Sequence, residues 1–380
     1  RVLPINTQKV RRVLVVGENA IKMMTVGGGS SSLKVQREIS PLQGLQARLV
    51  KDGVEVDFAR GYVGDVTGAY NGVTTGQNLE DKRSEAELIA EAVEKAKAAD
   101  CVILFGGLNK SDYQDCEGHD RQQYELPYAQ DKLITALAAA NKNFVYVNIS
   151  GNAVAMPWRD KVPAIVQGWY LGSEAGEALA SVLTGDANPS GKLPFTWVKS
   201  LQNVGAHALN TYPGTWRKEG GSKTEGNIID EEYKEGIYVG YRWADRKKQR
   251  PVFAFGHGLS YTQFAISNLR ADKASMTAAD SITFTVQVKN IGQRAGSETV
   301  QLYVHDAKAS VDRPLKELKG FQKVSLLPGE SKDVTITIGK DALSFYDETT
   351  ASWKAEPGQF EAWVGNASDN LKLKKTFELK

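Results

Sequence analysis

The hydrophobic pattern changes near residue 262, and this change limits the folds open to the chain more than any other feature. Before it, short apolar runs such as residues 13–16 and 101–105 alternate with stretches in which apolar residues recur every three or four positions. Short apolar runs are typical of strands buried on both faces of a parallel sheet, and the longer period is typical of helices. We therefore predict an α/β domain with a mostly parallel sheet for the first part of the chain.

Capping residues mark the ends of several elements in this first part. Ser84, followed three positions later by Glu87, has the pattern of a capping box that opens a helix. Gly185 stands where a glycine commonly ends one. The expected order is a strand at 13–16, a helix from 41, a strand at 54–59, a helix from 85 to about 99, a strand at 101–105, a helix from 126, strands at 144–147 and 164–167, a helix at 174–184 and, after a turn at 188–194, a last strand.

After residue 262 only strands are expected. Residues 282–288, 300–304 and 334–338 alternate apolar with polar side chains, and turn signals lie at 290–292 and 327–330. This pattern predicts an immunoglobulin-like β-sandwich. The expected organisation is a linker at 1–12, an α/β sandwich domain at 13–215, an irregular connection at 216–262 that includes the Gly- and Lys-rich residues 220–223, and the β-sandwich at 263–380.

Composition narrows the class of partner. Hydrophobic residues make up 41% of the 380, but no apolar run is long enough to span a bilayer. Lys and Arg number 47 against 45 for Asp and Glu, so the formal net charge is +2, and the charges are dispersed. Neither nucleic acid nor an anionic membrane is therefore expected as a partner, and a neutral ligand fits better.

The cysteines point to neither a disulfide nor a metal. Cys101 begins an apolar run and Cys116 lies in a polar segment, and these are the chain's two cysteines. No disulfide framework or zinc spacing is visible in their arrangement. We therefore expect no metal and no cofactor, and the redox compartment stays undetermined.

The polar segment that follows residues 101–105 is the first candidate for chemistry. Catalytic groups commonly lie on loops beyond the carboxyl ends of parallel strands. Glu117 could protonate a leaving oxygen there, because Gly118 lets the adjacent backbone turn. Asp112, Asp115 and Asp120 are rival carboxylates, and by spacing alone a solvated turn is the alternative interpretation.

The run of three glycines and three serines at 27–32 is the second candidate. Consecutive glycines let the backbone approach a partner, and serines offer hydroxyl groups. A flexible surface loop is the alternative. A phosphate cradle would need the Walker lysine and serine, and residues 17–20 lack the G-x-G-x-x-G of a dinucleotide site.

Three separate segments resemble one family in the same order along the chain. They are CEGHDRQQYELPYAQDKLI, GEALASVLTGDANPSGKLPFTW and FAFGHGLSYTQF. Together they resemble the C-terminal half of glycoside hydrolase family 3, the β-glucosidase and β-xylosidase group. The resemblance runs from about Val13 to the end and covers the family's second and third domains, the third being fibronectin-III-like. The family's N-terminal (β/α)8 barrel is expected to be absent from this chain.

The resemblance implies roles for particular residues. Glu117 matches the family's acid/base glutamate, whereas the aspartate nucleophile belongs to the barrel. Ser30 matches a serine that contacts a sugar hydroxyl. Apart from the resemblance, Asp120 and Arg121 are expected to pair with each other or with the fold and so to support the loop of Glu117, because arginine offers a planar fork for carboxylates. The fibronectin-III-like domain is expected to act as a structural prop, with carbohydrate binding as the alternative role.

These expectations combine into one functional hypothesis. The chain would be the C-terminal part of a retaining, exo-acting β-glycosidase that hydrolyses a β-linked glucoside or oligosaccharide and is inactive without the barrel. The alternative is a non-catalytic carbohydrate-binding or structural fragment. A homodimer and a periplasmic or secreted location are further expectations, while sugar and linkage specificity would lie mostly in the barrel.

Overall fold

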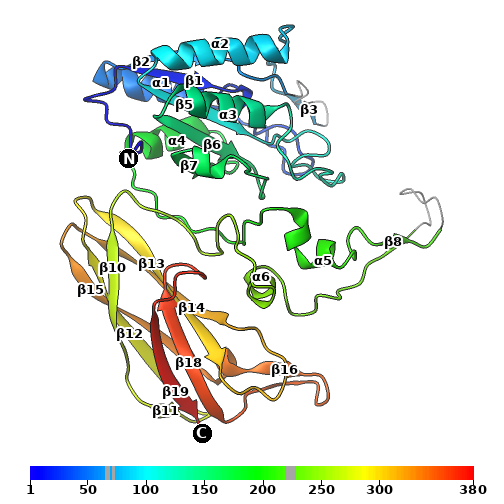
Figure 1. Cartoon of the computed structure of the whole chain (residues 1–380), viewed down its shortest axis with the longest axis vertical. Coiled ribbons are helices and arrows are strands. Elements are labelled where there is room, and N and C mark those ends of the chain that lie inside the picture. The colour runs from blue at the N-terminus through cyan, green and yellow to red at the C-terminus, as the bar shows by residue number, and fades with distance from the viewer. Residues whose placement is uncertain (65–68, 71–72, 219–227) are drawn as a thin grey trace. The chain divides into compact units, whose positions relative to one another are not determined.

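A computed structural model describes residues 1–64, 69–70, 73–218 and 228–380. The chain forms two compact units, Arg1–Ala187 and Asn188–Lys380 (Figure 1). Residues 220–223 of the expected connection lie outside the described residues. The expected boundaries after 215 and 262 do not coincide with the division at 187 and 188.

A five-stranded parallel sheet in the order β2-β1-β5-β6-β7 forms the centre of the first unit. Every residue of β5 and β6 is buried, as the short apolar runs predicted. The strands are β1 (Arg12–Val16), β2 (Glu55–Ala59), β5 (Cys101–Gly107), β6 (Phe144–Ile149) and β7 (Ala164–Gln167), and a small antiparallel pair consists of β3 (Ala69–Tyr70) and β4 (Val73–Thr74).

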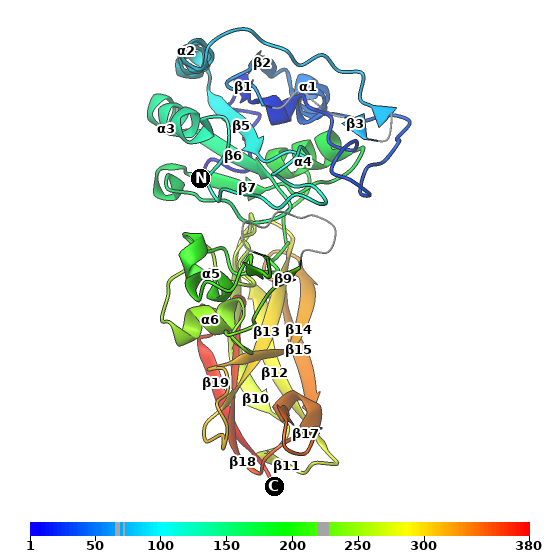
Figure 2. The ribbon, with the colours of Figure 1, turned by 90° about the vertical axis from the view of Figure 1, so that its right-hand side faces the viewer.

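Helices cover both faces of this sheet. Figure 2 shows α1 and α4 on one face and α2 and α3 on the other. The predicted capping box is confirmed, because the Ser84 side chain accepts from the Glu87 amide and the Glu87 carboxylate accepts from the Ser84 amide. The α-helices are α1 (Pro41–Leu49), α2 (Glu85–Ala98), α3 (Gln130–Ala140) and α4 (Ala175–Thr184), and the 3-10 helices are Glu18–Ala20, Val50–Asp52 and Arg159–Lys161.

Glycine allows the two helices of one face to approach closely. A Cβ built on Gly44 in α1 would lie 2.1 Å from the carbonyl oxygen of Gly176 in α4. Close approach brings Leu45 and Leu49 into one buried cluster with Leu183, which also includes apolar side chains of β1, β5 and β6. This cluster therefore ties α1 and α4 to the sheet.

Three local expectations for this unit were wrong. The helix expected from 126 begins at Gln130, because Tyr128 and Ala129 adopt left-handed backbone angles (φ 61° and 54°). The expected linker is part of the unit, since Ile5 is buried and its amide donates to Leu183 O at 2.9 Å. Among the residues that the structure describes, no strand after 188–194 joins the sheet; Trp197 instead forms an isolated bridge with Phe253 in the second unit.

The second unit contains the predicted β-sandwich. One sheet has the order β10-β12-β15 and the other β11-β19-β18-β13-β14. All pairings are antiparallel except that of β11 with β19. The strands are β10 (Phe264–Ala271), β11 (Ser275–Met276), β12 (Ser281–Asn290), β13 (Gly296–Asp306), β14 (Glu317–Leu326), β15 (Ser331–Gly339), β18 (Gly358–Gly365) and β19 (Leu373–Leu379), with a hairpin of β16 (Phe345–Asp347) and β17 (Ser352–Lys354) and a 3-10 helix at Lys340–Leu343.

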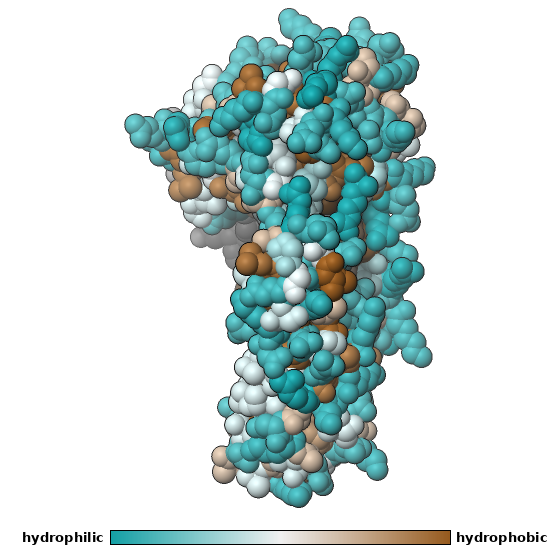
Figure 3. Space-filling view, turned by 90° about the vertical axis from the view of Figure 1, so that its left-hand side faces the viewer, coloured by the Kyte–Doolittle hydropathy of each residue, from teal (hydrophilic) through white to brown (hydrophobic). Residues whose placement is uncertain are grey.

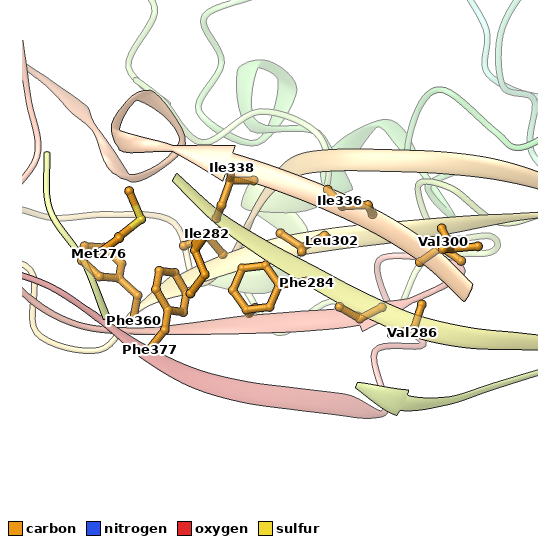
Figure 4. Close-up of a cluster of buried hydrophobic side chains, with 14 of the residues drawn as sticks. Met276, Ile282, Phe284, Val286, Val300, Leu302, Ile336, Ile338, Phe360 and Phe377 are labelled. Carbon is orange, nitrogen blue, oxygen red and sulfur yellow. The ribbon is translucent and has the colours of Figure 1, made fainter. Parts of the chain in front are cut away.

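Alternating residues of the facing strands build the core of the sandwich. Along β12 nearly every second side chain is buried, as its period of two predicted. Phe284 of β12 packs edge-on against Phe377 of β19, with ring centroids 5.3 Å apart, and Phe360 of β18 stacks on the same ring. Figure 4 shows these side chains pointing toward one another between the sheets.

Residues between the two regular parts pack on this sandwich. The Tyr241 hydroxyl accepts from the amide of Leu318 at 2.9 Å, and Arg242 pairs with Glu317 at 2.9 Å. This largely irregular segment therefore belongs with the second unit rather than with the α/β domain. Its elements are the 3-10 helix Leu201–Asn203, α5 (Gly205–Ala208), β8 (Thr215–Trp216), β9 (Ile229–Asp230) and α6 (Tyr241–Arg246).

Hydrophilic side chains predominate on the face that Figure 3 shows, with hydrophobic ones standing singly or in small groups. Among the described helices, none combines the length and the hydropathy that crossing a bilayer would require.

Candidate active-site loops

The end of β5, where the candidate loop begins, is held by hydrogen bonds from the segment after β1. Asn19, which is buried, donates from its side-chain amide to Gly106 O and Leu108 O, each at 3.0 Å. A Cβ on Gly17 would lie 2.1 Å from Phe105 O, so glycine is needed where the chain passes β5. The segment at 17–20 therefore supports the end of β5. This packing explains Gly17 without a dinucleotide site.

A buried ion pair joins the segments that follow β1 and β2. Glu18 Oε2 accepts from Arg60 Nη2 at 2.7 Å and from the Gly64 amide at 2.6 Å, and both side chains of the pair are buried. Lys22 Nζ lies 3.9 Å from the other carboxylate oxygen. The paired charges hold the chain beyond β1 and β2 in place, because separating buried partners would leave a charge uncompensated.

Asp115 ties the loop after β5 to the loops after β6 and β7. Its Oδ2 accepts from the Gly151 amide at 2.8 Å and from the Tyr170 hydroxyl at 2.9 Å, while Oδ1 accepts from Asn152 Nδ2 at 2.7 Å. Burial, followed by the charge of Asp115, raises the pKa of Tyr170 well above its usual value, so the phenol stays a donor. The sequence indicated Asp115 only as a rival carboxylate and did not predict this structural role.

Arg121 ties the far side of the same loop to residues beyond β6. Its Nη1 donates to Asn152 Oδ1 and its Nη2 to Ala153 O, both at 2.7 Å. The guanidinium also lies 5.5 Å from the ring centroid of Tyr124. Asp120 is exposed beside it. These contacts join Arg121 to the fold, which is one of the two pairings expected for it, and they provide a physical basis on which it could support the loop.

The structure brings Ser30 and Glu117 into contact. The Ser30 amide donates to Glu117 Oε2 at 2.7 Å, and the Glu117 amide donates to Gly28 O at 2.9 Å. Gly27, Gly28 and Gly29 all have left-handed φ angles of 101°, 78° and 94°. A Cβ on Gly29 would lie 2.5 Å from the Cβ of Glu117. Glycine is therefore required for the two loops to meet.

The contact with Ser30 also favours the charged form of Glu117. Hydrogen bonding from the Ser30 side chain, followed by its backbone amide, lowers the pKa of Glu117 from its usual value. Both residues are exposed in this chain. The arrangement by itself thus favours a carboxylate that accepts protons, whereas a general acid working near neutral pH needs a raised pKa.

Lys110 is a cation beside both loops that sequence reasoning did not select. Its Nζ donates to Ser31 O at 3.4 Å and lies 6.0 Å from the ring centroid of Tyr170. Burial lowers the pKa of this half-buried amine. Its position next to the glycines follows from the pairing of β1 with β5, which no local pattern indicates.

Three residues of types that bind metals also meet on the loop of Glu117. Asp112 Oδ1 lies 3.3 Å from His119 Nδ1, and Cys116 Sγ donates to His119 O at 3.4 Å. The ligand atoms of these three side chains all lie within 4.8 Å of one another. The two cysteines have no zinc spacing between them, so the sequence predicted no metal site; the pattern that could have indicated one is Cys116 with His119 three residues later.

The fold and the loops define a class of protein: an α/β domain with a carboxylate loop at the carboxyl edge of its sheet, followed by a β-sandwich. Comparison with known families gives the particular family. Residues 1–241 match the family described as glycosyl hydrolase family 3 C-terminal domain, and residues 298–368 match the fibronectin type III-like domain. The chain therefore belongs to glycoside hydrolase family 3 and corresponds to its C-terminal half, which confirms the resemblance and the predicted fold class.

Relatives of this chain are named as β-glucosidases. Beta-glucosidase BoGH3A of Bacteroides ovatus is 47% identical over 384 residues, which cover 99% of this chain and 48% of that protein. Thermostable beta-glucosidase B of Acetivibrio thermocellus is 42% identical over 301 residues, which cover 79% of this chain and 38% of that protein. The chain thus spans about half, or less, of the length of these curated relatives.

Solved structures show the same fold over the whole chain. The crystal structure of a GH3 β-glucosidase from Bifidobacterium adolescentis matches with a TM-score of 0.83 and 33% identity, covering 100% of this chain and 50% of that one. DesR, a β-glucosidase from Streptomyces venezuelae in complex with D-glucose, matches with a TM-score of 0.85 and 27% identity, covering 100% and 57%.

Proposed function

We propose that this chain is the C-terminal half of a retaining, exo-acting β-glycosidase in which Glu117 is the general acid/base. The observation that carries the proposal is the 2.7 Å contact between the Ser30 amide and Glu117 Oε2 at the carboxyl edge of the parallel sheet. Loops in this position are the usual place for ligand and catalytic groups in α/β folds. The β-glucosidase names of the relatives support a β-glucoside as substrate.

The proposed chemistry has two steps, each using Glu117 once. In the first, a carboxylate of the barrel domain attacks the anomeric carbon, the glycosidic C–O bond breaks, and Glu117 gives its proton to the leaving oxygen. In the second, the Glu117 carboxylate takes a proton from water as the water oxygen attacks the anomeric carbon and releases the barrel carboxylate. Ser30 is proposed to contact a sugar hydroxyl beside Glu117.

The low pKa of Glu117 in this chain is compatible with the proposal if the surroundings change on substrate binding. A barrel domain and a bound sugar would exclude water from this exposed carboxyl group, and desolvation raises a carboxyl pKa. A sugar hydroxyl that engages Ser30 would also compete for the hydrogen bonds that now stabilise the carboxylate. Because the attacking carboxylate is proposed to lie on the barrel domain, the 380-residue chain alone is expected to show no hydrolysis of aryl β-glucosides.

The test is Glu117→Gln in the full-length enzyme that we propose contains this chain. Dinitrophenyl glucosides, whose leaving group departs without a proton, should keep near-normal glycosylation rates, while poor leaving groups should lose on the order of 100-fold or more. Azide should restore turnover and give the β-glycosyl azide, because it attacks the covalent intermediate without base help.

Glu125→Gln is the matched control, because Glu125 is an exposed glutamate on the same loop. Glu125→Gln should lose no more rate with poor leaving groups than with good ones, and azide should not change its turnover. Equal losses for good and poor leaving groups in Glu117→Gln, with no effect of azide, would assign the acid/base role to another residue.

A second candidate function is carbohydrate binding by the β-sandwich. Tyr346 and Trp353 form an edge-to-face pair on the β16–β17 hairpin, with ring centroids 5.7 Å apart, and their side chains are 52% and 68% exposed. Exposed aromatic rings of this kind can stack on the apolar face of a pyranose. Specific binding of the chain on a glycan array, lost in Trp353→Ala, would favour this function; no binding would count against it.

A further inference from the structure

We propose that the loop between β5 and α3 binds one zinc-like divalent ion through Asp112, Cys116 and His119. The ligand atoms of these three side chains already lie within 4.8 Å of one another. Asp112 and His119 are 73% and 50% exposed, so an ion can reach them from solvent. This binding site goes beyond the glycosidase function and does not depend on it.

The backbone of the loop produces this convergence. Gly118 has a φ of 86°, which turns the chain between Cys116 and His119 so that the Cys116 thiol reaches the carbonyl oxygen of His119. Tyr113 also has a left-handed φ, of 62°, and its ring packs against the His119 imidazole with centroids 4.9 Å apart. The ring contact fixes the imidazole with Nδ1 on the side of Asp112.

The distances suit a small tetrahedral ion. Zinc binds sulfur at about 2.3 Å and nitrogen or oxygen at about 2.0–2.2 Å, so neighbouring ligand atoms in a tetrahedron lie roughly 3.3–3.7 Å apart. The 3.3 Å between Asp112 Oδ1 and His119 Nδ1 already meets this condition. The Cys116 sulfur would need to move by about 1 Å, which an exposed loop allows, and water would supply the fourth ligand.

The ligand types select the class of ion. A thiolate and an imidazole favour zinc and its transition-metal neighbours, whereas calcium and magnesium prefer oxygen ligands. On binding, the Cys116 thiol gives its proton to solvent and its hydrogen bond to His119 O is replaced by the metal–sulfur bond. The charges of the thiolate and the Asp112 carboxylate then balance that of the divalent ion.

The site would also constrain Glu117, which lies between two of the ligands in the sequence. A closed chelate that includes Cys116 and His119 would restrict the backbone that carries the carboxyl group. This consequence rests on the proposed function: if Glu117 is the acid/base, zinc should inhibit the full-length enzyme reversibly, because the loop could no longer adjust to the leaving group.

Cobalt(II) is the probe for the site itself, because its thiolate complexes have d–d bands in the visible range, whereas zinc is a d10 ion and has none. Titration of the 380-residue chain with Co²⁺ should give one equivalent of a species with sulfur-to-metal charge-transfer and tetrahedral d–d bands, which Zn²⁺ displaces and EDTA removes. Cys116→Ser should abolish the charge-transfer band, and His119→Ala should weaken binding by at least about tenfold.

Cys101→Ala is the matched control, because Cys101 is buried in β5 and is the only other cysteine. It should leave the titration unchanged. Absence of the bands in the unmodified chain, their persistence in Cys116→Ser, or their loss in Cys101→Ala would each overturn the site.

Enzyme assays separate the site from its consequence. Zn²⁺ inhibition of the full-length enzyme that EDTA reverses and Cys116→Ser abolishes would support the constraint on Glu117. If the 380-residue chain binds Co²⁺ as expected but the full-length enzyme is insensitive to Zn²⁺, the metal site stands and only the inhibitory effect is refuted. Failure of the Glu117→Gln experiment would leave the Co²⁺ titration unaffected.

Discussion

Ser30 and Glu117, 87 positions apart in the sequence, meet through a 2.7 Å hydrogen bond from the Ser30 amide to Glu117 Oε2. The contact exists because β1 and β5 are neighbours in the sheet and each is followed by a loop that leaves the same edge. The glycines before Ser30 let the first loop lie directly against the second. Substitutions at this contact should therefore reveal whether the pKa and the proposed role of Glu117 depend on where the contact holds its carboxyl group.

If Glu117 is the proposed acid/base, Gly29→Ala should displace it and lower the glycosidase activity of the full-length protein. The new methyl group would lie 2.5 Å from the Cβ of Glu117 and 2.6 Å from its Oε2. Displacement of a catalytic group by about 1 Å costs on the order of 100-fold in rate. The measurement is kcat/KM on a substrate with a poor leaving group.

Gly53→Ala is its control, because Gly53 also has a left-handed φ, of 68°, but among the described residues no atom beyond its chain neighbours lies within 4 Å of the added Cβ. Both variants carry a backbone penalty of about 1 kcal/mol in stability, and only Gly29→Ala should lose activity. Equal kinetic losses in the two variants would mean that backbone strain, not the contact with Glu117, is responsible.

The pKa of Glu117 in this chain should lie below its usual value and rise toward it in Ser30→Ala. Hydrogen bonding from Ser30 stabilises the carboxylate, and the substitution removes the side-chain contribution while keeping the amide. Because the folded pKa is lowered, the contact stabilises the fold above the unfolded pKa of about 4.3 and ceases to do so as the pH falls through the folded value. Carbon-13 NMR titration measures the shift; an unaltered pKa in Ser30→Ala would contradict it.

Asp115→Ala should lower the free energy of unfolding by about 1–3 kcal/mol, because three donors would lose their acceptor. Urea denaturation of the chain measures this change. Combining it with Tyr170→Phe should cost less than the sum of the two single changes, since both remove the same hydrogen bond. Asp160→Ala, at a side chain that is 87% exposed, should change the stability by less than about 0.5 kcal/mol.

Leu302→Ala should destabilise the β-sandwich by about 2–5 kcal/mol, because Leu302 is fully buried and its removal leaves a cavity. The measurement is again urea denaturation of the whole chain. Phe321→Ala is the contrasting change on the neighbouring strand β14, where the ring is 67% exposed. A large loss at Phe321 with little change at Leu302 would place the core elsewhere.

The sequence predicted the elements best where the deciding interactions are local. The Ser84 and Glu87 capping box and the Gly185 helix end both depend on groups a few residues apart, and both were found as expected. The prediction of a helix from 126 was wrong because Tyr128 and Ala129 adopt left-handed backbone angles, which are uncommon for these residue types and could not be predicted from them. The expected boundary after 215 does not coincide with the division at 187 and 188, because Asn188 hydrogen-bonds to Ala295 and Ser260, which lie 107 and 72 positions further along the chain.

The α/β unit followed by a β-sandwich could thus be predicted from the sequence alone, because a helix or strand buried on one face leaves a periodic pattern and a strand buried on both faces leaves a short apolar run. The sequence also indicated Glu117 and Ser30, through motifs that resemble a family. The contact between these two residues, the role of Asp115 as a structural acceptor and the convergence of Asp112, Cys116 and His119 became visible in the folded chain. Those relationships depend on which strands become neighbours and how loops turn at their ends, and such distances leave no periodic pattern in a sequence.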